Sequence, residues 1–161
     1  MMPKSYRRIS RPSSPAARTG FSMLEMLVVV IILGILVAVA VPKMAMIMRH
    51  ERVNRAAQVV TQDLQNGFAM AGRQRLPVRL TFYPSDLKYI FTDRATGQVL
   101  QQRLLGKGTD YSITSLASDN TIVDVMPNGI GSVSFIVTVS NGDYSRQVKA
   151  SSAGFVRMSP Q

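Results

Sequence analysis

The residues around position 20 have the types and spacing that charge pairing inside a membrane would need. Glu25 is the single acidic residue at the start of an apolar stretch that has no polar side chain from Met26 to Val41. A carboxylate at the centre of a bilayer costs roughly 2.5–3.5 kcal/mol, and less near the interface. The next basic residue on the C-terminal side is Lys43, beyond helical reach. Glu25 therefore needs a partner from elsewhere.

A cut after Gly20 would supply that partner. The first twenty residues hold five basic side chains and no acidic one, and their removal would leave a positively charged amine on Phe21. That amine would lie one helical turn from Glu25 of the same chain, or it would face Glu25 of a neighbouring chain. Buried among apolar helices, such a salt bridge would satisfy both charges and set the register between chains.

The elements that must hold these residues are a basic leader and a membrane-spanning helix. Residues 1–20 contain three prolines and several serines and read as an unfolded leader, although the same composition fits a cytoplasmic tail that is kept. Residues 21–42 are about as long as a helix needs to cross a bilayer, roughly 20 residues. The positive-inside rule keeps the N-terminus in the cytoplasm. Ala38 and Ala40 could imitate a signal-peptidase site, which leaves ordinary secretion as an alternative.

Composition excludes several classes of function. The chain of 161 residues is long enough for one modest domain. Half of its net charge of +10 lies in the leader, so the overall charge does not indicate a nucleic-acid-binding protein. There is no cysteine, and His50 is the only histidine, so most metal and nucleophile constellations are excluded. We expect no enzyme activity, no cofactor and no metal site.

The helical pattern continues past the membrane span. Apolar residues recur at steps of three and four, the spacing of one helical face: Val53, Ala56, Ala57, Val60, Leu64, Phe68 and Ala71. The polar residues of this segment fall largely off the stripe: Arg52, Arg55, Gln58, Gln62 and Asp63. Gly72 and Pro77 predict the end of a helix over residues 22–74, and Pro42 predicts a kink or a loosened turn within it.

After Pro77 the periodicity changes to two, which predicts strands. Strands or short extended segments are expected at 78–82, 87–92, 99–105, 121–126, 133–139, 146–150 and 155–158. The pair Asn141-Gly142 is a strong hairpin signal. The predicted fold class is α+β: a long N-terminal helix, transmembrane in its first half and amphipathic in its second, packed on an antiparallel sheet. The head would cover residues 43–161, with helix 43–75 and strands within 77–158.

These features together resemble the type IV pilin and type II secretion pseudopilin family. That family has a basic leader, then Gly, an aromatic first mature residue and Glu as the fifth mature residue, which Gly20, Phe21 and Glu25 match. Gly34 and Pro42 stand where the family commonly has Gly and Pro. The remaining alternative is an unrelated signal-anchored protein with a β-rich head.

The resemblance implies a life cycle. A prepilin peptidase would cut between Gly20 and Phe21 and methylate the new N-terminus. The mature chain would wait in the bacterial inner membrane, among its lipids, with a periplasmic head. An inner-membrane assembly platform would then extract it into a filament with other pilins. Glu25 would direct assembly, and Gly34 and Pro42 would mark where the helix bends or melts.

Two C-terminal segments are similar to the GspH/FimT kind of minor pilin: the phrase at 126–129 and the end at 152–157. Some FimT-like proteins bind DNA through a Gly-Arg-x-Arg motif. Here Gly154 and Arg157 fit, but Phe155 stands where the first Arg is expected. A basic patch could still form from Arg157, Lys149 and Arg146 and bind phosphates. DNA binding is therefore the alternative function. The same three residues would also fit an ordinary solvated face.

Overall fold

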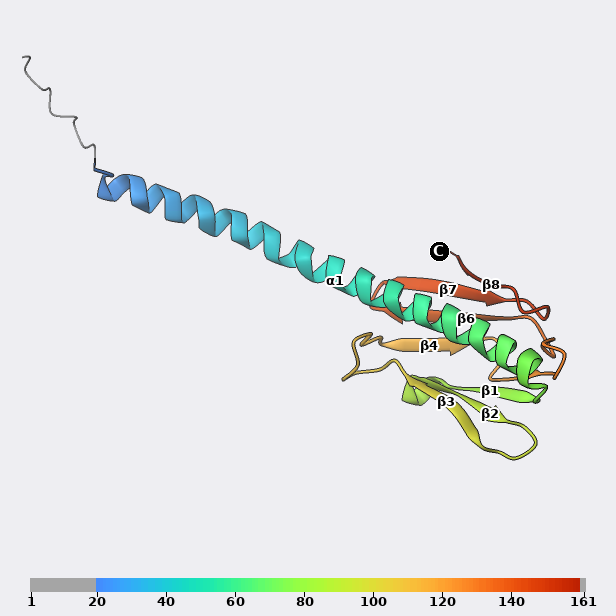
Figure 1. The fold of residues 1–161 in the computed structure, drawn as a ribbon. Helices are drawn as coiled ribbons and strands as arrows, with labels where there is room; N and C mark the ends of the chain where they lie inside the picture. The colour runs from blue at the N-terminus through green and yellow to red at the C-terminus, as the bar shows by residue number, and fades with distance from the viewer. Residues whose placement is uncertain (1–19, 160–161) are drawn as a thin grey trace, which may run out of the picture. The chain divides into compact units, whose positions relative to one another are not determined.

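This computed structural model describes residues 20–159, which form one long helix, one short 3-10 helix and eight strands. The leader before Gly20, with its five charges, lies outside the described residues. The elements are α1 (Met23–Gln74), β1 (Val78–Tyr83), η1 (Pro84–Asp86), β2 (Lys88–Asp93), β3 (Val99–Leu104), β4 (Ser115–Ser118), β5 (Ile122–Val125), β6 (Phe135–Asn141), β7 (Tyr144–Ala150) and β8 (Val156–Ser159). Figure 1 shows them in order of colour.

The chain divides into two compact units, one through Ala40 and one from Val41. The described part of the first unit is Gly20 and the start of α1, and every residue in it is exposed. Helical structure continues through Pro42 without a break. Because proline has no N–H, the Ala38 carbonyl lacks its usual helical donor, and the turn is weakened there rather than ended.

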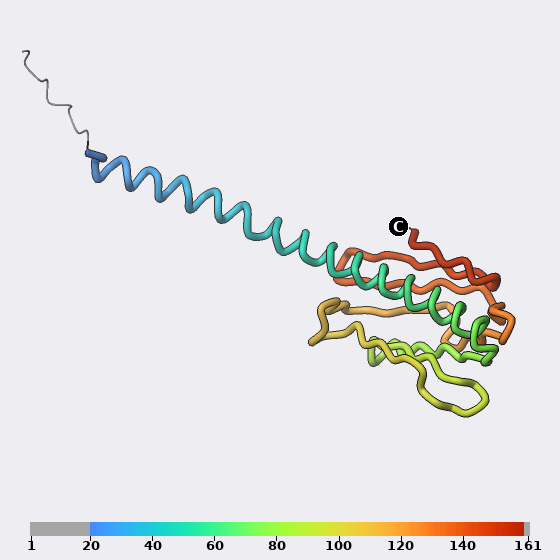
Figure 2. The backbone as a smooth tube through the Cα atoms, in the orientation of Figure 1, coloured from blue at the N-terminus to red at the C-terminus, as the bar shows by residue number. Residues whose placement is uncertain are grey.

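The second unit contains two four-stranded antiparallel sheets. Their strand orders are β3-β2-β1-β5 and β4-β6-β7-β8. Within this unit both sheets lie beside the green, C-terminal part of α1, and the tube in Figure 2 passes from that helix into β1 through a short connection. The fold is the predicted one, a helix on antiparallel strands. The period-two pattern had not indicated the division into two sheets.

The core lies between the helix and the sheets. All seven apolar residues of the predicted helical stripe are buried, which confirms that face of α1. Small side chains let the helix come close to the strands. At Gly67 the approach is so close that a Cβ there would collide with the Phe91 ring of β2.

The placement of Asp63 off the apolar stripe was wrong. Asp63 is only 4% exposed. Arg103 of β3 donates to both carboxylate oxygens, at 2.8 and 3.0 Å, and the Tyr89 hydroxyl donates to one of them at 2.7 Å. A charge can be buried when it is paired and fully hydrogen-bonded. Asp63 therefore fastens α1 to β2 and β3.

Two local details also differ from the sequence pattern. The hairpin between β6 and β7 pairs Asn141 with Tyr144, so its loop is Gly142-Asp143 rather than Asn141-Gly142. Gly142 has a φ of 62°, and Asp143 is not among the residues with positive φ, the pattern of a type II′ turn. Strand β4 was not predicted, because its sequence Ser-Leu-Ala-Ser has one large apolar residue.

Candidate assembly site

The first turn of α1 contains Ser22 and Glu25 in the arrangement of a helix cap. The Glu25 N–H donates to the Ser22 Oγ at 3.1 Å. With Ser22 before the first helical residue and Glu25 third in the helix, the spacing is that of a capping box. Sequence reasoning missed the role of Ser22, although Ser three residues before Glu at the start of an apolar run is its signal. The cap fixes where the helix begins, at Met23, three residues after Gly20.

The Glu25 carboxylate lies in that first turn without a counter-charge. No ion pair joins it to any basic side chain of residues 20–159. An acidic group in the first turn of a helix gains roughly 0.3–1 kcal/mol from the helix dipole at an exposed surface. Capping and the dipole therefore account for an acid at this position in water. Neither the cap nor the helix dipole accounts for an acidic residue at the end of an apolar span that has to enter a membrane.

The surface that follows Glu25 is apolar on every side. Large side chains from Met26 to Val41 are each between 43% and 66% exposed. The most apolar 18-residue window of α1 has a mean hydropathy of 3.1, and none of it is buried within the structure. By length and composition, this helix is able to cross a membrane. Gly34 faces open space, since a Cβ at this position would have no neighbour within 4 Å.

Of the three cations proposed for DNA binding, the structure brings two together. Lys149 and Arg157 are directly opposite each other on β7 and β8, so their side chains leave the sheet on the same face. Arg146 is three residues from Lys149 on the same strand and therefore faces the other way. Its Nε donates to the Asn54 Oδ1 of α1 at 2.9 Å, and its guanidinium lies 5.2 Å from the Tyr144 ring centre.

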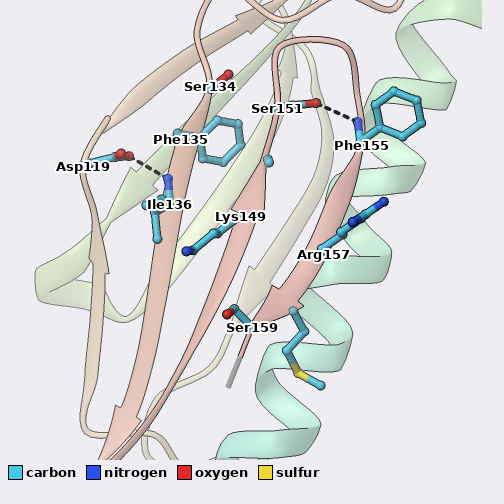
Figure 3. Close-up of a pocket in the computed structure, with 11 residues that line it drawn as sticks. Asp119, Ser134, Phe135, Ile136, Lys149, Ser151, Phe155, Arg157 and Ser159 are labelled. Carbon is cyan, nitrogen blue, oxygen red and sulfur yellow. Dashed lines mark hydrogen bonds between the residues drawn. The ribbon is translucent and has the colours of Figure 1, made fainter. Parts of the chain in front are cut away.

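Lys149 and Arg157 border a groove of about 770 Å³ on that outer face. Figure 3 shows them with Asp119, Ile136 and Phe155, which also line it. Phe155 is 71% exposed, at the place where the Gly-Arg-x-Arg pattern has an arginine. The face is thus a mixture of apolar and charged groups and not a continuous basic patch.

Residues 20–159 offer no group of three or more His, Asp or Glu side chains that could hold a metal ion. The single histidine is instead stacked on Tyr144, with ring centres 4.0 Å apart. Where the structure describes the chain, the features left to consider are therefore the N-terminal helix and the outer face of β7 and β8.

Sequence comparison identifies the N-terminal segment. Residues 16–41 match the prokaryotic N-terminal methylation motif, which is typical of prepilin-peptidase substrates. The matched segment contains Gly20, Phe21, Glu25 and Gly34. No curated protein matches the chain in sequence.

Solved structures share the fold. The type IV minor pilin FimU of Pseudomonas aeruginosa is 15% identical with a TM-score of 0.57, over 68% of this chain and 90% of that one. The minor pseudopilin EpsH from the type 2 secretion system of Vibrio cholerae is 17% identical with a TM-score of 0.56, over 68% of this chain and 97% of that one. The motif and these folds confirm the resemblance drawn from the sequence. The matched structures are those of a minor pilin and a minor pseudopilin.

Proposed function

We propose that this chain, a minor-pilin-like or pseudopilin-like protein with a prepilin-peptidase-type motif, is a structural subunit of a type II secretion pseudopilus or a type IV pilus. The observation that carries the proposal is Glu25. It is an acid without a counter-charge in the described chain, in the first turn of a helix whose next sixteen residues are apolar and exposed.

Processing supplies the missing charge. Prepilin peptidase cuts the peptide bond between Gly20 and Phe21, and the new amine of Phe21 is methylated. A methylated amine stays basic, so it keeps a positive charge near the first turn of α1. The cut also removes the five basic side chains of the leader, which would otherwise hold the N-terminus at the cytoplasmic surface.

Assembly then pairs the charges between chains. When two α1 helices lie side by side with a stagger, the Phe21 amine of one subunit meets the Glu25 carboxylate of the next. In an apolar surrounding an unpaired carboxylate is costly. A neighbour in the wrong register leaves both charges unpaired, so the pair selects one register.

Before assembly the chain waits in the bacterial inner membrane. Residues 21–42 cross it once among lipids, the N-terminus is cytoplasmic, and the head of residues 43–161 is periplasmic. The inner-membrane assembly platform moves the subunit into the filament, next to other pilins. Gly34 and Pro42 are the two positions where α1 is easiest to bend, since one is a glycine in an open surface and the other removes a helical hydrogen bond.

The test replaces Glu25 by Gln in the native host, because Gln keeps the size and helix propensity and removes only the charge. We expect normal membrane insertion and normal cleavage, with at least a tenfold loss of incorporation into filaments. Ser22→Ala is the matched control, since it removes the cap and keeps the charge. Normal incorporation of the Glu25→Gln protein would show that the carboxylate has no role in assembly.

A deletion of the gene distinguishes the two machines, because loss of protein secretion indicates a pseudopilus and loss of surface pili indicates a type IV pilus.

Binding of DNA for uptake is the second candidate function, suggested by the exposed pair Lys149 and Arg157. With Arg146 turned towards α1, few phosphate contacts remain, so any binding should be weak and should fall with salt. A mobility-shift assay of the head with duplex DNA tests it, and no shift at low salt removes it.

A further inference from the structure

Most basic side chains on the strands have an acidic or polar partner. Arg79 pairs with Asp124 at 2.7 Å, and Arg103 pairs with Asp63 at 2.8 Å. Lys88 reaches Asp86 at 2.7 Å, and Arg146 donates to Asn54. Lys149 and Arg157 are the exceptions, because neither forms an ion pair or a hydrogen bond within residues 20–159.

These two cations also occupy directly opposed positions on β7 and β8. Like charges at such positions destabilise a sheet, and Figure 3 shows the two side chains pointing away from each other. Natural sequences break such a local rule mainly where function requires it. A single carboxylate on the outer face above the two strands would reverse the sign of this interaction, since both cations could turn to bind it.

The groove beside them combines these charges with accessible apolar side chains. Its accessible apolar side chains are Ile136 and the exposed Phe155. Phe135 and Ala150 also border the groove but are buried, and Met158 alternates with Arg157 on β8 and so leaves the opposite face. The exposed Phe155 is held by its backbone: the Ser151 N–H donates to the Phe155 carbonyl at 2.9 Å, and the Phe155 N–H donates to the Ser151 Oγ at 3.2 Å. An exposed aromatic ring beside an arginine is the combination that dominates the energy of many protein interfaces.

The turn that presents Phe155 is anchored to the helix. Gly154 has a φ of 82°, which glycine adopts without strain. A Cβ at this position would lie 3.3 Å from the ring of Phe68 in α1, so the turn is pressed against the core. The Gly154 N–H also donates to the Ser151 carbonyl at 3.0 Å. The phenyl ring of Phe155 is therefore presented by a rigid element.

We propose that this groove docks an acidic segment of another filament subunit, with a carboxylate between Lys149 and Arg157 and an apolar side chain on Phe155. The proposal rests on the proposed function, because it names the partner as a filament protein. A peptide fits better than DNA. Asp119 lines the same groove and opposes any further acid there, so the groove suits one carboxylate between the two cations better than the row of phosphates on a DNA backbone.

The experiment places a photo-crosslinking residue at the groove in the native host. Phe155 is replaced by p-benzoylphenylalanine in the full chain, and filaments are irradiated. The expected product joins position 155 to another subunit, at a peptide with Asp or Glu within three residues of the link. Charge reversal with Lys149→Glu and Arg157→Glu should lower the yield at least tenfold. Changing that acid of the partner to Lys should restore it.

Two controls make the result decisive. The same crosslinker at Ile31, in the apolar helix, reports filament incorporation independently of the head. Lys107→Glu reverses an exposed cation in the loop after β3, away from the groove, and should leave the yield at 155 unchanged. The milder variant Lys149→Gln with Arg157→Gln, checked for normal circular dichroism, should lose most of the yield without introducing repulsion.

The outcomes separate the two proposals. Crosslinking at 31 without crosslinking at 155 overturns the docking site and leaves the filament function standing. No crosslinking at either position overturns the filament function and the docking site with it. A link at 155 to a peptide without an acid, or one that survives charge reversal, also contradicts the docking site. A nuclease-sensitive product at 155 would assign the groove to nucleic acid.

Discussion

Two glycines in the same helix should respond in opposite directions to replacement by alanine. At an exposed helical position alanine is more favourable than glycine by ~1 kcal/mol. At Gly67 the new Cβ would overlap the Phe91 ring, with three ring carbons at 3.2 Å or closer. Phe91 is 2% exposed and meets Tyr89 edge-on at 5.9 Å, so the ring has no space to move. Overpacking of this kind costs ~1–3 kcal/mol.

Because the overlap at Gly67 is severe, we take the upper end of that cost. After subtracting the helical gain, Gly67→Ala should lower the free energy of unfolding by ~2 kcal/mol. At Gly72 a Cβ would lie 3.7 Å from the Cα of Gly129, an ordinary contact. Gly72→Ala should therefore raise the free energy of unfolding, by up to ~1 kcal/mol.

Urea unfolding of residues 43–161, followed by circular dichroism, measures both values. This fragment is suitable because all buried apolar side chains of the described chain lie between Val53 and Val156. The second change Phe91→Leu should recover part of the loss in Gly67→Ala by removing ring atoms. Equal stabilisation by both alanines would refute the close approach of α1 to β2 at Gly67.

Two further variants test charges of the head in the same assay. Asp63→Ala removes a carboxylate that holds Arg103 and Tyr89, and should cost ~2–3 kcal/mol, less than for a fully buried pair because Arg103 reaches solvent. A double variant with Arg103→Ala should cost less than the two single changes added, and strict additivity would deny the pairing. The hydrogen bond from Arg79 holds the pKa of the Asp124 carboxyl below its usual range. The ionised Asp124 therefore stabilises the fold at any pH above the unfolded pKa of ~3.9, and this stabilisation is lost as the pH falls through the lower folded pKa. Asp124→Asn should therefore weaken the loss of stability in acid, and an unchanged pH profile would contradict this.

The long helix could be predicted from the sequence because the signals for it are local. An uninterrupted apolar run, a stripe at helical spacing and the stops at Gly72 and Pro77 place it at 22–74, and the structure has Met23–Gln74. The motif around Glu25 was readable for the same reason. The cap from Ser22 had an equally local signal, Ser-x-x-Glu, and it was missed because Glu25 was considered only as a charge.

Features that depend on contacts between residues far apart in the sequence could not be predicted. Asp63 looks like a solvent-facing residue until Arg103, forty residues later, is placed beside it. The two sheets arise because β5 pairs with β1 instead of with β4, its neighbour in sequence, and alternation alone does not specify partners. The opposite facing of Arg146 and Lys149 was in principle readable, because their spacing is odd on a strand.

The most direct test of the account is the N-terminus of the chain purified from membranes and filaments of its own host. Mass spectrometry of the N-terminal peptide should find a chain that starts at Phe21 with a methyl group on its amine. An assembled chain that retains residues 1–20, or one that starts after Ala40, would contradict the account, because Glu25 would then have no new amine to pair with.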